Sequence, residues 1–190
     1  MQIPTNEQRH VEDAKKSLCY VSLQYNKDRV AAARKPSDFE ETYVSRDGKV
    51  TLVMGDERFR APELIFTPKL LPTMKPQRSL QAAVLECMTK TDISIRPKLL
   101  QNVVLAGGGS MFKNIAKRVK HELSELIAKD PRGMNTTADA IKVIALENAQ
   151  QCWRGAALQV RDDKAQGDET RLLSREEYYR QGLASFKHHW

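Results

Sequence analysis

The sequence contains few of the features that mark secreted, membrane or metal-binding proteins. No apolar run approaches the length of about 20 residues that is needed to span a bilayer. The first ten residues, MQIPTNEQRH, lack the apolar core of a signal peptide. Its 3 cysteines, Cys19, Cys87 and Cys152, are far apart and form no CxxC or Cys/His ligand spacing. We therefore expect a cytoplasmic or nuclear chain that binds no membrane and keeps its cysteines as buried free thiols.

Basic residues are in excess, but they form no basic motif. The 190 residues include 31 Lys and Arg against 24 Asp and Glu, which gives a net charge of +7. This charge favours acidic partners, either nucleic acid or the acidic face of another protein. Because the cations, Arg118 among them, are scattered and not interleaved with aromatic residues, a solvated surface is the more frequent explanation and no motif indicates nucleic acid.

No histidine or carboxylate stands at the spacing of a catalytic or metal site. His10 and His121 have neither a nucleophile nor a metal ligand at a useful spacing, so both are predicted to be solvated. Glu63, Glu86 and Asp92 are predicted to be surface charges or caps. The sequence therefore assigns no catalytic residue and no metal ligand.

What the chain does contain is an apolar run that ends in three glycines, NVVLAGGGSMF at residues 102–112. The order predicts a buried strand, a tight turn and a helix, with Gly107, Gly108 and Gly109 at positive φ in the turn. Such a turn can hold a phosphate or a nucleotide base. Its spacing is neither GxxxxGK[ST] nor GxGxxG, and glycines in such turns also serve close strand–helix packing, so both explanations remain open. The helix that follows is predicted to bury Ile115, Val119, Leu123 and Leu126.

Hydrophobic periodicity predicts the remaining elements. A first helix, capped by Asn6 or Thr5, extends to about Tyr25. Further elements are a short helix at 30–35, a hairpin at 43–54 that turns at Asp47-Gly48, helices at 79–90 and near 95–102, and a strand at 142–146. The glycine strand, its helix and the last strand form a βαβ unit with parallel strands. Residues 161–170 are predicted to be an exposed loop, and Ser174 with Glu177 caps a final short helix.

Several of these segments, taken in order, resemble the actin and actin-related protein family. The strings that carry the resemblance are LCYVSL (18–23), YVSRDGKV (43–50), GDERFRAPELIF (55–66), KTDISIRPKLLQNVVLAGGGSMFKNIAKRV (90–119), KVIA (142–145), CWRGAA (152–157) and LSREEYYRQG (173–182). The match is collinear, covers nearly the whole chain and is similar to the C-terminal half of that family.

The resemblance implies an α/β fold of the actin-like ATPase (ribonuclease-H-like) type, C-terminal half only, with a βαβ unit around the glycine turn and an incomplete sheet. Residues 1–75 would form part of the outer small subdomain. Residues 76–150 would form the outer large subdomain with the glycine turn, and residues 151–190 would return toward the missing first lobe.

The same resemblance implies an adenine-nucleotide pocket. Gly107, Gly108, Gly109, Met111 and Phe112 match the turn that lies under the adenine ring and sugar in the family, and Lys15 matches a lysine that borders the adenine.

Three positions depart from the family pattern. Phe112 stands where actins carry tyrosine, Lys16 stands where an acidic residue bonds the ribose, and Ala149 replaces a lysine. ATP or ADP is therefore expected to bind weakly or not at all, with Mg only if an N-terminal half is present.

The expected function is a non-catalytic structural subunit of a larger assembly, of the chromatin-remodelling or the cytoskeletal (dynein-activator) class. Its partners would be other protein subunits, including actin or chromatin-complex subunits. Two alternatives stay open: a filament-forming actin-like ATPase whose N-terminal half lies outside this sequence, and a basic nucleic-acid-binding module.

Overall fold

The computed structural model describes residues 5–71, 77–129, 140–146, 148–167 and 174–182. It divides into two compact units, Met1–Asn148 and Ala149–Trp190, which are described separately. The first unit contains, in chain order, α1 (Thr5–Leu18), α2 (Tyr25–Arg34), η1 (Pro36–Asp38), β1 (Glu41–Val44), β2 (Thr51–Met54), α3 (Glu57–Glu63), η2 (Pro68–Leu70), α4 (Leu80–Thr89), α5 (Arg96–Leu100), β3 (Val103–Leu105), η3 (Gly108–Met111), α6 (Ile115–Lys129) and β4 (Val143–Ala145). The second unit contains α7 (Gln151–Gln166) and α8 (Arg175–Gln181). The division of the chain into three subdomain segments stays a prediction.

The first sheet is the hairpin predicted around Asp47-Gly48. β1 and β2 pair antiparallel, with Val44 opposite Thr51. Gly48 has φ 70°, a value that glycine adopts without strain. The Ser45 amide donates to the Val50 carbonyl at 2.8 Å and closes the turn. The hairpin prediction is confirmed.

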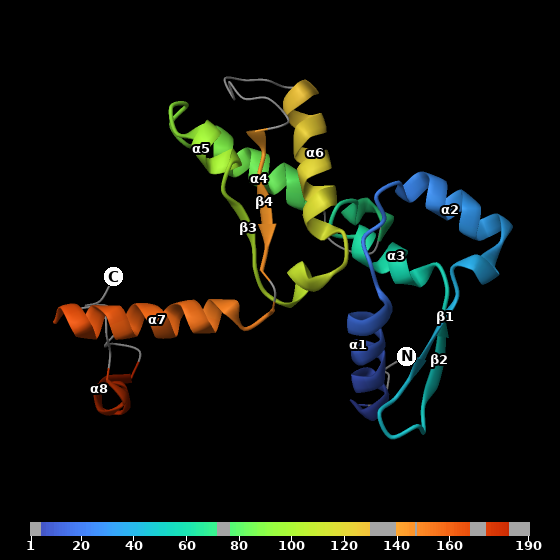
Figure 1. Ribbon diagram of the computed structural model, residues 1–190, viewed down its shortest axis with the longest axis horizontal. Coiled ribbons are helices and arrows are strands. Elements are labelled where there is room, and N and C mark those ends of the chain that lie inside the picture. Colours follow the sequence, from blue (N-terminus) through green and yellow to red (C-terminus); the bar gives the residue numbers. More distant parts are fainter. Residues whose placement is uncertain (1–4, 72–76, 130–139, 147, 168–173, 183–190) are drawn as a thin grey trace. The chain divides into compact units, whose positions relative to one another are not determined.

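The second sheet is the predicted βαβ unit. β3 and β4 pair parallel, with Val104 opposite Ile144, and α6 lies between them in the sequence (Figure 1). The other four strand residues, Val103, Leu105, Val143 and Ala145, pack against the core cluster. Val104 and Ile144 point the other way and are 55% and 37% exposed. One face of this small sheet is therefore covered by the core, and the opposite face is apolar and open.

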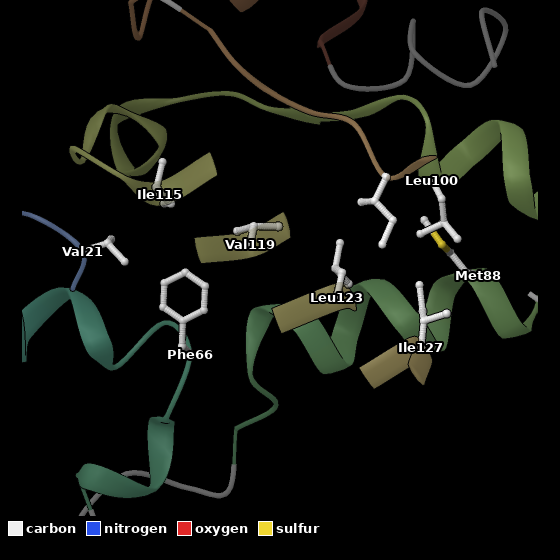
Figure 2. Packing of buried hydrophobic residues seen from close by; sticks show 9 residues of the cluster. Val21, Phe66, Met88, Leu100, Ile115, Val119, Leu123 and Ile127 are labelled. Carbon is white, nitrogen blue, oxygen red and sulfur yellow. The ribbon is translucent and has the colours of Figure 1, made fainter. Parts of the chain in front are cut away.

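α6 supplies one side of the core. Figure 2 shows Ile115 near Val21 and Phe66 at one end of the cluster, while Ile127 lies near Leu100 and Met88 at the other. The buried positions of α6 include Ile115, Val119, Leu123 and Ile127. Leu126 was predicted to be the last buried residue of this helix, but the buried residue is its neighbour Ile127. Ile127 follows Leu123 by four residues and so lies on the same helix face.

α1 ends at Leu18, earlier than the predicted Tyr25. The segment after it is extended because its backbone bonds to other parts of the chain. The Tyr20 amide donates to the Arg58 carbonyl and the Val21 amide to the Lys113 carbonyl, both at 3.0 Å. These long-range bonds compete with helix hydrogen bonds and have no local sequence signal. The side chains of Thr5 and Asn6, the predicted caps, lie outside the described residues.

The helices at 79–90 and near 95–102 are confirmed as α4 and α5. Ser79 is the N-cap of α4, and its hydroxyl accepts from the Ala82 amide at 3.4 Å. Cys87, predicted on the buried face of α4, is exposed, and its neighbour Met88 is buried instead.

The expectation of buried thiols holds only for Cys19, because Cys87 and Cys152 are exposed. Burial raises the pKa of the Cys19 thiol, while the nearby cations Arg58 and Lys15 oppose that rise.

In the second unit the predicted loop at 161–170 was wrong in its first part. α7 continues to Gln166 and ends at Gly167, whose left-handed conformation (φ 71°) is a common helix terminator. Residues 161–166 include Arg, Lys, Ala and Gln, which favour helix, so their polarity alone did not indicate a loop. α8 begins directly after Ser174 as predicted, while the side chain of Glu177 and residues 168–170 lie outside the described residues. None of the helices in the described ranges is long and apolar enough to cross a bilayer.

Candidate functional site

The glycine turn follows β3, as the sequence predicted. Gly107 has φ 87° and ψ 178°, and the next four residues form the 3-10 turn η3. The Ser110 amide and hydroxyl both donate to the Gly107 carbonyl, at 3.2 Å and 2.8 Å. The expectation of positive φ at all three glycines was wrong, because only Gly107 adopts it and Gly108 and Gly109 belong to the 3-10 turn.

The turn is open around all three glycines. A β-carbon added at Gly107, Gly108 or Gly109 would meet no other described atom within 4 Å. Close strand–helix packing within the described chain therefore does not explain the glycines. The turn leaves room for a ligand or another chain to approach the backbone, which is consistent with the nucleotide-binding explanation.

The other predicted site residues lie on both sides of this turn. Met111 is exposed, whereas Phe112 is half-buried and packs against the core cluster. Lys15 is exposed in the last turn of α1. The chain just after α1 lies beside the chain just after η3, through a bridge between Tyr20 and Lys113. The backbone segments that follow Lys15 and the glycine turn are therefore neighbours. No described contact joins the Lys15 side chain to a glycine of the turn.

Lys16 is engaged with its own helix. Its ammonium group lies 2.8 Å from the Glu12 carboxylate, one turn earlier, and both side chains are exposed. Their hydrogen bond raises the pKa of Lys16 and lowers the pKa of Glu12. Ala149 is exposed and belongs to the other unit.

The Arg118 guanidinium, which the sequence did not single out, makes four hydrogen bonds to other described residues. Nη1 and Nη2 donate to the two Glu63 oxygens at 3.1 Å and 3.0 Å, Nε donates to Glu122 at 2.6 Å, and Nη1 also donates to the Ser22 carbonyl at 2.6 Å. Glu63 is 1% exposed and Arg118 is 7% exposed. Both residues had been predicted to lie on the solvated surface, so this is a correction. The bond network joins α3, α6 and the segment after α1.

Electrostatics and packing both fix Arg118 in this position. Burial lowers the pKa of Arg118, but the hydrogen bonds to Glu122 and Glu63, together with the negative charges of both carboxylates, outweigh burial and leave the pKa raised. The guanidinium also lies over the Phe66 ring, 4.9 Å from its centroid. A signal for this burial was present, because Arg118 follows Ile115 by three residues and so lies on the apolar face of α6.

The described residues show no group of three or more His, Cys, Asp and Glu side chains that could hold a metal ion.

A comparison of the sequence with known protein families gives a match over almost the whole chain. The family model described as Actin covers residues 3–188.

Proposed function

The chain belongs to the actin family, and from this premise we propose that it acts as a non-catalytic structural subunit of a larger protein assembly. The assembly would be of the chromatin-remodelling or the cytoskeletal class, in the nucleus or cytoplasm. The nucleotide pocket would be degenerate and would contribute to folding or docking more than to chemistry.

The open face of the β3–β4 sheet carries this proposal. Val104 and Ile144 lie opposite each other in register and are both exposed. In the described part of the chain, neither strand pairs with a third, so the sheet also leaves its outer backbone edges open. A two-stranded sheet with an uncovered apolar face is marginal in water and gains stability when another polypeptide covers it. That polypeptide is either further actin-family structure or a partner subunit.

The geometry around the glycine turn supports a weak nucleotide site. The open backbone at Gly107 leaves room for a ring or sugar. Lys15 is exposed in the last helical turn of α1, and the chain that follows α1 bonds through the Val21 amide to the Lys113 carbonyl, just after the glycine turn. Lys16 stands where the family supplies a carboxylate acceptor and is paired to Glu12. A cation in that position offers no acceptor to a ribose hydroxyl, which is a reason to expect low affinity.

The assembly proposal is tested by the native mass of the protein in extracts of its source cells. We expect the wild-type chain to elute in a complex well above its own 21.6 kDa, and Val104→Lys to move it out of that complex. Val53→Lys, on an exposed face of the hairpin, is the matched control and should stay in the complex. A wild-type chain that elutes as a single copy overturns the proposal.

The nucleotide part of the proposal is tested on the purified chain, by thermal unfolding with and without ATP and magnesium. A ligand at a hundred times its Kd stabilises a protein by about 2.7 kcal/mol, so we expect a clearly smaller shift and no phosphate release. Steady phosphate release that disappears in a Lys15→Ala variant would overturn the non-catalytic proposal in favour of an actin-like ATPase.

A further inference from the structure

A groove lies between the start of α2 and the η2 turn, away from the glycine turn. Its first part is a cavity of about 630 Å³ between α2, η2 and α6, and its second part is a cavity of about 400 Å³ between α2, α3 and η2. Tyr25, Arg29 and Leu70 line both parts. The two cavities therefore adjoin, and we call them together the α2–η2 groove.

The side chains that line this groove include more cations than carboxylates: Lys27, Arg29, Arg60 and Arg118 against Glu57, Glu63 and Glu122. Lys27 and Arg29 line it, are exposed, and have no ion-pair partner among the described residues. Two of the carboxylates in its wall, Glu63 and Glu122, accept from Arg118. The third, Glu57, lines the second part and accepts from the Gly55 amide. At the rim, Lys117 precedes the lining residue His121 by one helical turn and so lies on the same side of α6. An approaching anion thus meets Lys27 and Arg29, which no described carboxylate pairs with, in a groove whose lining cations outnumber its carboxylates.

The groove is also apolar along its floor and edge. Leu23 and Leu70 line the first part, Leu70 and Leu71 line the second, and all three side chains are exposed. Leucine side chains gain free energy when they leave water, in proportion to the apolar area that is buried. A single small anion would leave these leucines exposed, whereas a peptide can cover them and reach Lys27 and Arg29 together.

We propose that the α2–η2 groove binds an acidic peptide segment of a partner protein, in which carboxylate side chains are interleaved with apolar ones. The inference rests on the proposed function, since it assigns a docking surface to the subunit and an acidic segment with apolar side chains to its partner. Charge complementarity selects the acidic side chains, and the exposed leucines select the apolar ones. A nucleic acid backbone would pair with the cations but would leave the exposed leucines in water.

The test is fluorescence anisotropy with the full purified chain and a short fluorescein-labelled peptide in which Asp and Leu alternate. Two further probes replace Asp by Asn and Leu by Ser, and labelled single-stranded RNA is the fourth. The variant Lys27→Glu with Arg29→Glu reverses the groove charge. Arg46→Glu with Lys49→Glu makes the same change on the exposed hairpin turn and is the matched control. Circular dichroism verifies that each variant is folded.

We expect the Asp–Leu peptide to bind the wild type and the hairpin control equally, and the groove variant about tenfold more weakly. Binding should weaken between about 0.1 M and about 1 M salt, because exposed charges are screened. Equal binding of the Asn or Ser peptide, an unchanged affinity in the groove variant, or preferential binding of RNA would each overturn the inference. If the peptide fails to bind while the wild-type chain still elutes in a large complex, the groove inference fails and the proposed function stands. Peptide binding by a chain that elutes as a single copy would contradict the proposed function alone.

Discussion

The glycine turn stands out in the sequence but is open in the structure, whereas the Arg118–Glu63 pair does not stand out in the sequence but is buried in the structure. The glycine turn is conspicuous in the sequence, yet in the described structure no neighbouring atom lies within 4 Å of a β-carbon placed at any of its glycines. Arg118 and Glu63 are ordinary charged residues in the sequence, yet they are buried and joined by two hydrogen bonds. The conspicuous turn is therefore open in the described structure, while the inconspicuous pair joins segments of the first unit.

The position of the pair explains its structural role. Glu63 ends α3, Arg118 lies in α6, and the Ser22 carbonyl belongs to the segment after α1. Three segments far apart in the sequence therefore meet at one guanidinium. A buried charge without its partner costs several kcal/mol because the protein interior solvates it poorly.

The largest expected effect is therefore the loss of one partner of the buried pair. Arg118→Ala leaves the Glu63 carboxylate buried without its ion-pair partner, and we expect the free energy of unfolding to fall by about 3–5 kcal/mol. Chemical denaturation monitored by circular dichroism measures this change. Arg60→Ala removes a partner from the exposed Arg60–Asp56 pair and should cost less than about 1 kcal/mol.

A double substitution separates the charge effect from a packing effect. Arg118→Met with Glu63→Leu removes both charges and keeps most of the volume, so it should recover most of the stability lost in Arg118→Ala. If the double variant is no more stable than Arg118→Ala, the pair matters through its shape and not through its charge balance.

The sequence was sufficient where structure follows from local chemistry. Asp47-Gly48 indicated the hairpin, the apolar periodicity of residues 79–90 indicated α4, and the alternation of apolar runs with an amphipathic helix indicated the parallel βαβ unit. Each of these depends on residues close together in the chain or on a strong periodicity.

The sequence was insufficient where structure depends on distant partners. The end of α1 at Leu18 is set by backbone bonds to Arg58 and Lys113, and the burial of Glu63 is set by Arg118. These partners are separated by 38 or more positions, and helix propensity, which is a local property, does not predict them. The assignment of Lys15 and the glycine turn to a nucleotide site came from family resemblance, and it stays a prediction until a ligand is tested.

A smaller effect is expected at the glycine turn, and it differs between neighbours. Gly107→Ala places a side chain at φ 87°, which should lower the free energy of unfolding by about 1–2 kcal/mol. Gly108→Ala meets no neighbouring atom and has no positive φ, so its effect should stay within about 0.5 kcal/mol. Thermal unfolding of the two variants, without nucleotide, measures the difference.

This pair of variants also distinguishes packing from binding. If Gly108→Ala leaves stability unchanged but removes the shift caused by ATP, its open space serves a ligand. Equal destabilisation by both variants would mean that the turn is packed in solution and does not differ from the buried pair in this respect.

The smallest effect is expected at the exposed pair of Glu12 and Lys16, which lies on the helix that carries Lys15. The hydrogen bond to Lys16 lowers the pKa of Glu12 from 4.5, so its contribution to stability is present above that value and is lost as the pH falls through the lowered pKa. The same bond raises the pKa of Lys16 from 10.5, so its contribution is present below that value and is lost as the pH rises through the raised pKa. Glu12→Gln should therefore lower Tm slightly at pH 7, by an amount that vanishes in acid and at about 1 M salt, where exposed charges are screened. The loss in Arg118→Ala should persist in the same salt, because that pair is buried. A Glu12→Gln loss that is large or insensitive to salt would show that Lys16 and Glu12 belong to a buried site, and the contrast between the two regions would then break down.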